Sequence, residues 1–266
     1  MGTPIGNLKD ITFRAVEVLS LVDSIFCEDT RVSSKLFSHY NIKKPLFSFN
    51  SHNFLKQSEF VLKKLESGSV GLVTDAGMPG ISDPGSFLVN LVRENNYDVV
   101  VIPGPSSLTA SIALSGFKPN SWLFAGFFPK DTSKRKEVIK AYMDSKGHLI
   151  FFESAKRLYE TLLWIKANFE INPKVCVLRE ITKIYEEVNC FELFSVEEKA
   201  DLSSVKGEIV VALESIDLAE DNERFYELAA DLIKLGVEPS NLSKLFAKHI
   251  GINKNWLYKK LLQDKR

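Results

Sequence analysis

The stretch from 70 to 85, VGLVTDAGMPGISDPG, constrains the fold most, because a short apolar run leads there into a loop of glycines, prolines and aspartates. The run at 70–73 has the length of a buried parallel strand. Gly77, Pro79 and Gly80, followed by Pro84 and Gly85, then exclude a regular helix or strand. Open α/β sheets bind ligands at the carboxyl ends of their strands, so this loop predicts a small-molecule site.

Short apolar runs alternate with helical patterns through the first part of the chain, which indicates a parallel sheet with right-handed crossovers. We expect strands at 24–27, 46–49, 70–73 and 99–102, and helices at 54–65, at 86–95 and from 106 to 114. A second loop, PGPSS at 103–107, should open on the same sheet edge as the first, so that both reach one ligand. A third, TPIGN at 3–7, is either another such loop or a frayed end.

The pattern changes after Gly116. An aromatic segment at 122–128 and a basic one at 129–136 precede strands at 148–152, 175–178 and 209–213, with a helix at 155–168. From about 219, three apolar-periodic segments are broken at 236–239 and at 251–252. We therefore expect an α/β protein with an N-terminal domain at 1–116, a second α/β domain at 117–216 and a helical, helix-turn-helix-like tail at 217–266.

Composition excludes several classes of protein. Thirty-four basic and 34 acidic residues balance, which disfavours a dedicated nucleic-acid coat. No apolar run approaches the roughly 20 residues of a membrane span, and no signal-peptide pattern opens the chain. The three cysteines are widely spaced, which indicates reduced thiols in a cytoplasmic protein, and the four histidines are not paired as metal ligands. Dinucleotide, Walker and nucleophile-elbow motifs are absent.

Charged residues follow three of the expected strands. The cluster Glu28-Asp29-Thr30-Arg31 can cap a helix, or it can orient a substrate and remove a proton. Glu153 and Glu180 leave the same two interpretations open. The lysines of the tail either contact phosphates or are merely solvated.

Eight segments, spread over nearly the whole chain, together resemble the ribosomal RNA small subunit methyltransferase I family, which has the tetrapyrrole methylase fold: TPIGNLKDIT, CEDTRVSSKL, LVTDAGMPGISDPG, IPGPSS, GFFPK, FFESAKRL, REITK and VKGEIVV. The resemblance implies two α/β domains, a parallel sheet and then a mixed one, usually in a homodimer with S-adenosylmethionine between the domains and no metal. It implies methyl transfer to the ribose 2′-oxygen of a cytidine in the decoding region of 16S rRNA.

The resemblance also suggests roles for individual residues. Cofactor contacts are expected from Asp75, Gly77, Met78, Gly104, Ser106, Ser107 and Phe152. The catalytic candidates are Glu28, Asp29, Arg31, Glu153, Glu180 and Lys183, among which the sequence does not choose. RNA contacts are expected from Arg31, Lys130, Arg135, Lys254 and Lys259.

Two features depart from the family pattern. Met78 and Gly80 stand where the family commonly has threonine and leucine. An apolar strand normally precedes the TPIGN loop, whereas here only Met1 and Gly2 do. Our hypothesis is that the chain starts too late or derives from a shortened copy. A missing strand would leave backbone groups unpaired, so we expect weaker cofactor binding and reduced stability.

Two other functions remain open at this point. One is a methyltransferase of the same fold acting on a tetrapyrrole or another small molecule, which the basic tail and the Glu28–Arg31 cluster disfavour. The other is a non-catalytic nucleic-acid-binding regulator, which the neutral charge and the three ligand-type loops disfavour.

Overall fold

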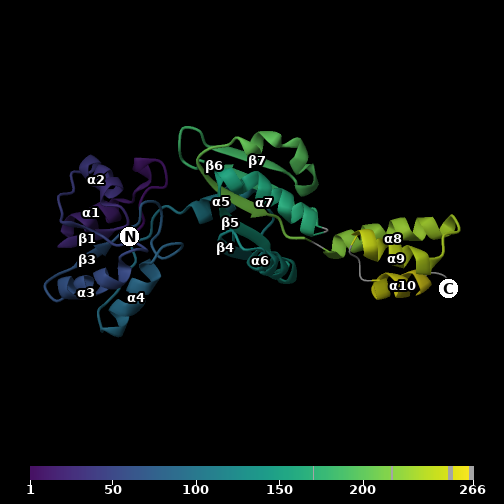
Figure 1. The fold of residues 1–266 in the computed structure, drawn as a ribbon, viewed down its shortest axis with the longest axis horizontal. Helices are drawn as coiled ribbons and strands as arrows, with labels where there is room; N and C mark the ends of the chain where they lie inside the picture. Colours follow the sequence, from purple (N-terminus) through teal and green to yellow (C-terminus); the bar gives the residue numbers. More distant parts are fainter. Residues whose placement is uncertain (170, 217, 251–253, 264–266) are drawn as a thin grey trace.

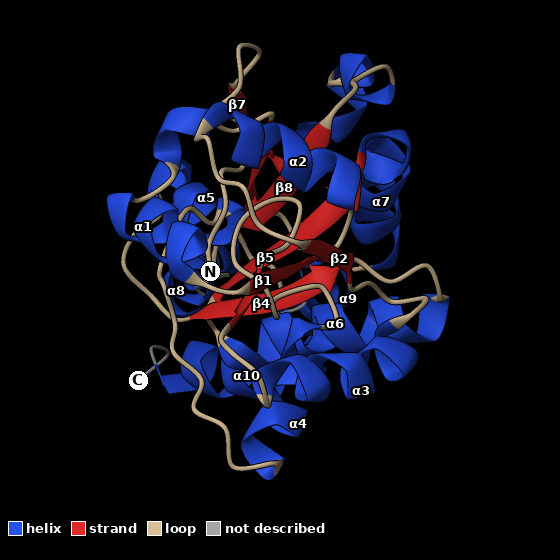
Figure 2. Ribbon diagram, turned by 90° about the vertical axis from the view of Figure 1, so that its left-hand side faces the viewer, coloured by secondary structure: helices blue, strands red, loops and turns tan. Residues whose placement is uncertain are grey.

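The structure is a computed structural model, and it describes residues 1–169, 171–216, 218–250 and 254–263. Figure 1 shows, in a row, a first sheet with its helices, a second sheet, and a group of helices at the other end. Viewed along the long axis, helices surround the strands (Figure 2). We propose domain boundaries at 116 and 216. Within the described residues, no helix is long and apolar enough to cross a membrane.

The first sheet is parallel, as expected, with the strand order β2-β1-β3. Its strands are β1 (Ser24–Cys27), β2 (Leu46–Ser48) and β3 (Val70–Leu72). Successive residues of β1 point to opposite faces. Ile25 and Cys27 pack with helices α1 (Phe13–Leu21) and α2 (Thr30–His39), whereas Phe26 packs with α3 (Phe54–Leu65) and α4 (Gly85–Glu94). A short 3-10 helix, η1 (Leu8–Asp10), precedes α1.

Among the described residues, those at 1–3 lie beside β3 and the loop that follows it. The Met1 amino group donates to the Leu72 carbonyl at 2.8 Å, and the Gly2 amide donates to the Ile102 carbonyl at 3.1 Å. The expected strand at 99–102 is therefore wrong: the segment passes this place, but a single backbone hydrogen bond ties it there. Val100 and Val101 are 70% and 61% exposed, and no strand of the described residues pairs with this segment.

The second sheet is mixed, also as expected, in the order β4-β5-β8-β6-β7. It contains β4 (Trp122–Phe127), β5 (His148–Ser154), β6 (Lys174–Arg179), β7 (Glu187–Glu192) and β8 (Glu208–Leu213). Only the pair β4 and β5 is parallel.

The two faces of this sheet are covered differently. Helices α6 (Thr132–Ser145), α7 (Ala155–Asn168), η2 (Leu193–Glu198) and η3 (Ala200–Ser203) lie on one face. Helix α5 (Ser107–Ser115) and Ile5 pack on the other, although both belong to the first part of the sequence. Two segments of the N-terminal part, at Ile5 and α5, therefore pack on the second sheet.

The expectation of reduced cysteines is wrong for one pair. Cys176 of β6 and Cys190 of β7 lie opposite each other in the antiparallel register and form a disulfide. The sequence did not reveal this pairing because β7, a largely exposed edge strand, was not predicted as a strand. Cys27 is free and buried.

Three helices follow the second sheet, in agreement with the expected tail: α8 (Leu218–Lys234), α9 (Pro239–Ile250) and α10 (Lys254–Gln263). They enclose a core of their own that includes Leu242, Phe246 and Leu257. Gly236, with a φ of 92°, makes the first expected break. The second, at 251–252, lies outside the described residues.

Candidate functional site

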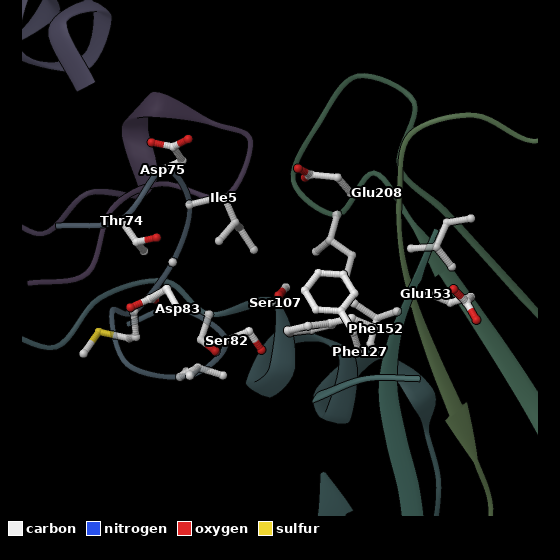
Figure 3. A pocket seen from close by; sticks show the side chains of 18 of the residues that line it. Ile5, Thr74, Asp75, Ser82, Asp83, Ser107, Phe127, Phe152, Glu153 and Glu208 are labelled. Carbon is white, nitrogen blue, oxygen red and sulfur yellow. The ribbon is translucent and has the colours of Figure 1, made fainter. Parts of the chain in front are cut away.

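A cavity of about 470 Å³ opens between the loop that follows β3 and the edge of the second sheet (Figure 3). Its wall on the first side comes from the loop at 74–83 together with Ile5 and the start of α5. Its wall on the second side comes from the ends of β4, β5 and β8. The two loops at 74–83 and 103–107 therefore converge on one space, as expected from the sequence.

Hydrogen bonds from backbone amides fix the first loop in shape. Asp83 Oδ1 accepts from the amides of Gly80 at 2.9 Å and of Gly85 at 2.7 Å, so this carboxylate braces the turn. Gly77 exchanges two backbone hydrogen bonds with Thr3, at 2.9 and 3.1 Å. The segment at 3–7 is thus an ordered part of the site and not a frayed end.

The second loop directs the N-terminus of α5 toward the cavity. Ser106 and Ser107 line the cavity, and the Ser106 side chain makes no capping hydrogen bond to the helix. The first amides of α5 are consequently available to a ligand, and the helix dipole favours a negatively charged group there.

Most of the expected cofactor residues line the cavity: Asp75, Gly77, Met78, Ser106, Ser107 and Phe152. Gly104 does not. It lies against Gly2, so closely that a Cβ on Gly104 would sit 2.8 Å from the Gly2 Cα atom. Its role is close backbone packing.

Glu28 is the carboxylate of the first cluster that lines the cavity. Its Oε2 accepts a hydrogen bond from the Thr74 hydroxyl at 2.8 Å. Asp75 Oδ1 accepts from the Asp29 amide at 3.0 Å. Burial, assisted by the charges of Glu28 and Asp29, raises the pKa of Asp75 above its ordinary value despite that hydrogen bond. The cavity therefore holds two neighbouring carboxyl groups in different environments.

Asp29 and Arg31 do not line the cavity. Asp29 is the N-cap of α2 and accepts from the Arg31 amide at 2.8 Å, which fits the capping interpretation. The Arg31 guanidinium pairs with the same carboxylate at 2.6 Å, and its hydrogen bonds lower the pKa of Asp29 to about 2. The Arg31 side chain is itself largely exposed.

Glu153 lines the cavity but is fully engaged elsewhere. It accepts from the Ser154 amide and from the Thr161 hydroxyl, each at 2.7 Å, and its Oε2 lies 3.3 Å from Arg157 Nη2. Only 3% of this residue is exposed. These contacts make Glu153 a structural anchor for the start of α7.

Glu180 and Lys183 lie behind the cavity wall. Lys183 Nζ bridges Glu180 Oε1 at 2.8 Å and Glu208 Oε2 at 2.9 Å, and of the three only Glu208 lines the cavity. The hydrogen bond from Lys183 lowers the pKa of Glu180. Burial alone would lower the pKa of Lys183, but its bonds to the two glutamates outweigh burial and raise it.

This ion-pair network also holds the N-terminal loop. A Cβ on Gly6 would lie 2.5 Å from Lys183 Cγ, so the loop at 3–7 packs directly on the lysine stem. Through this contact, the ion-pair network of the second sheet also supports the N-terminal loop that carries Ile5.

The expected RNA-binding residues are dispersed. Arg135 is engaged in packing: its Nε donates to the Pro129 carbonyl at 2.9 Å, and its guanidinium lies 5.3 Å from the Trp164 ring centre. Lys130 is exposed after β4, and Lys259 is exposed on α10. The side chain of Lys254 lies outside the described residues. No group of three or more His, Cys, Asp or Glu side chains in the described ranges is arranged to hold a metal ion.

Several residues of the wall were not predicted as site residues, among them Thr74, Phe127 and Glu208. Phe127 lies edge-to-face on Phe152, with ring centres 5.4 Å apart. Its position inside the GFFPK segment was the available signal. Thr74 and Glu208 lie inside the LVTDAGMPGISDPG and VKGEIVV segments and so carried the same signal, but their contacts with Glu28 and Lys183 could not be read from the sequence.

Comparison with known proteins gives one consistent result. Residues 1–197 match the family model of the tetrapyrrole (corrin/porphyrin) methylases. The ribosomal RNA small subunit methyltransferase I of Rickettsia prowazekii (strain Madrid E) is 41% identical over 214 residues, which is 80% of this chain and 76% of the relative. The enzyme of the same name from Haemophilus influenzae (strain ATCC 51907 / DSM 11121 / KW20 / Rd) is 36% identical over 264 residues, which is 97% of this chain and 93% of the relative. Among solved structures, a diphthine synthase shares the fold at 17% identity, with a TM-score of 0.62 over 80% of this chain and 88% of its own.

Proposed function

The chain belongs to the ribosomal RNA small subunit methyltransferase I family of tetrapyrrole methylases, and we propose that it methylates the ribose 2′-oxygen of a cytidine in the decoding region of 16S rRNA with S-adenosylmethionine as donor. Methylases of this family and fold use that donor in general. The observation that carries the proposal is the convergence of both glycine-proline loops and Glu28 on one cavity. We further propose a cytoplasmic homodimer.

The residues of the cavity fit the donor. A volume of about 470 Å³ lies in the range of small-molecule sites. The N-terminus of α5 suits a carboxylate, Asp75 suits an ammonium or a hydroxyl group, and Phe152 with Ile5 offers an apolar surface to a flat ring. When bound, S-adenosylmethionine supplies a methyl group on a positively charged sulfur.

Since such a methyl group is already activated, the chain's main task is to position the acceptor and remove its proton. Glu28 is the best-placed base. Thr74 holds its Oε2, which leaves Oε1 to accept the proton of the ribose hydroxyl. Glu153, Glu180 and Asp29 are poorer candidates, because hydrogen bonds and ion pairs already occupy their oxygens.

The test uses small ribosomal subunits that lack this methyl group, incubated with the protein and labelled S-adenosylmethionine. We expect label on one cytidine ribose. Glu28→Gln should lower kcat by about 10²- to 10⁴-fold, the usual contribution of a general base, with unchanged affinity for S-adenosylhomocysteine. Glu66→Gln, an exposed change at the end of α3, is the control.

Each contrary result selects another function. Methylation of a tetrapyrrole but not of subunits would favour the small-molecule methyltransferase. No binding of S-adenosylhomocysteine in calorimetry would favour the non-catalytic regulator.

A further inference from the structure

Phe127 is an exposed aromatic residue on the wall of the cavity (Figure 3). It leaves 64% of its surface in contact with solvent. Single exposed apolar residues are common on proteins. This one differs because it borders the proposed catalytic space, and because no role in donor binding has been assigned to it.

The backbone that presents Phe127 is firmly anchored. The next residue, Phe128, is buried, donates its amide to the Phe152 carbonyl at 2.9 Å and packs its ring 4.7 Å from that of Phe151. The Pro129 carbonyl then accepts from Arg135 Nε and Arg157 Nη2, each at 2.9 Å. The chain is thus fixed immediately after Phe127 while the ring itself stays open, which is the arrangement of a preorganised binding surface.

Positive charge follows Phe127 along the chain. Lys130 comes three residues later, and the first turns of α6 carry Lys134 and Lys136, both exposed. Lys156, in the first turn of α7, is exposed as well. Carboxylates line both walls of the cavity, including Asp83 on the opposite wall and Glu208 on this one. The cations that would contact a polyanion are therefore the lysines that follow Phe127, outside the cavity itself.

An exposed ring beside several cations is typical of surfaces that bind single-stranded nucleic acid, where bases stack on aromatic side chains and cations contact the backbone. A ribose hydroxyl can enter a cavity of this kind only if its nucleotide leaves the base stack. Stacking on a protein ring offsets part of the cost of that extrusion.

We propose that Phe127 is the stacking platform for the extruded base of the nucleotide whose ribose is methylated. The inference rests on the proposed function and deepens it, since it assigns the base-side contact of the acceptor. The neighbouring Phe152, which contacts the Phe127 ring edge-to-face, holds the platform in place.

The test compares Phe127→Leu, which keeps apolar volume without a ring, with Phe127→Trp, which keeps a ring. Phe127→Leu should lower kcat/KM for ribosomal subunits on the order of 10- to 100-fold, the loss expected for one stacked base. Phe127→Trp should stay near wild type, and so should Phe194→Leu, a matched change at a half-exposed phenylalanine of η2 outside the cavity. Affinity for S-adenosylhomocysteine should stay within twofold in all variants.

Two results would overturn the inference. Wild-type kcat/KM in Phe127→Leu would exclude stacking, and an equal loss of S-adenosylhomocysteine affinity would assign the ring to the donor. Binding of a short single-stranded cytidine oligoribonucleotide separates this inference from the proposed function. Weaker binding by Phe127→Leu in a protein that methylates no ribose would support stacking and contradict the proposed function, whereas equal binding would contradict stacking.

Discussion

Individual residues set the shape of the donor loop, and Gly77 is the clearest example. Its φ of 82° lies in the left-handed region, where an alanine costs about 1–2 kcal/mol. A Cβ there would point between Ile5 and Pro105, at 3.4 and 3.6 Å, so sterics permit the substitution.

Gly77→Ala should therefore lose about 1–2 kcal/mol of stability and also weaken donor binding, because the strained loop shifts against Thr3. Thermal melts and S-adenosylhomocysteine calorimetry measure the two effects. Gly116→Ala is the matched control: its φ is 65°, nothing lies within 4 Å, and it is outside the cavity. If both variants lost donor affinity alike, the effect would be global destabilisation.

Glu180 links stability to pH. Its folded pKa lies below the unfolded value of 4.5, chiefly because Lys183 donates to it. The stabilisation is thus fully present above pH 4.5 and is lost as the pH falls through the lower folded pKa.

We expect Glu180→Gln to be less stable than wild type at pH 7 and to approach it below pH 4.5, as measured by urea unfolding at several pH values. Glu187→Gln removes a more exposed ion pair, with Arg179, and should show a smaller effect. If the free energy of unfolding of Glu180→Gln stayed below that of wild type by the same amount from pH 7 to pH 3, this linkage would be contradicted.

At the scale of elements, the sequence predicted those whose residues face a core. The bounds of β1, α3 and α7 agree with expectation, because apolar side chains recur there with a clear period. Helix α6 and strand β7 were missed, since lysines dominate the first and alternating polar residues the second.

The site was predictable only in part, for a related reason. Glycines, prolines and carboxylates marked the loops of the first side. Phe127 and Glu208 on the second side act through contacts between strands that are distant in sequence, and local patterns do not record such contacts.

The edge of β3 next to Met1 and Gly2 leads to a prediction about adding a strand there. A short apolar strand fused ahead of Met1 should continue the hydrogen bonds of Met1 and Gly2 and cover Val100 and Val101. Burying such side chains stabilises by about 1.5–3 kcal/mol each, so we expect a higher Tm and tighter S-adenosylhomocysteine binding. A Gly-Ser extension of equal length is the control, and an equal gain from it would refute strand pairing.

At the scale of the molecule, helices α8–α10 lie at the end opposite the first sheet (Figure 1). Lys244 and Lys259 are exposed there, on α9 and α10. An RNA that reaches both the cavity and these helices would have to span the second sheet.

The double variant Lys244→Glu, Lys259→Glu should weaken binding to ribosomal subunits and reduce the salt slope by about 0.7–0.9 for each lost phosphate contact. Donor affinity, measured in parallel, should not change. A variant that binds subunits as wild type does would mean that these lysines are only solvated.

The cavity lies between the two sheets, each of which has a hydrophobic core of its own, and Ile5 and α5 of the first part also pack on the second sheet. A ligand that fills the cavity contacts residues of both sides at once and so adds binding free energy that links the two sheets. We expect the first sheet to melt before the second when no ligand is bound, so that the unfolding transition broadens. With ligand bound, unfolding of either sheet loses the binding free energy, so we expect the two sheets to melt as one unit. The sharpness of the thermal transition, and not only its midpoint, thus becomes a measure of occupancy.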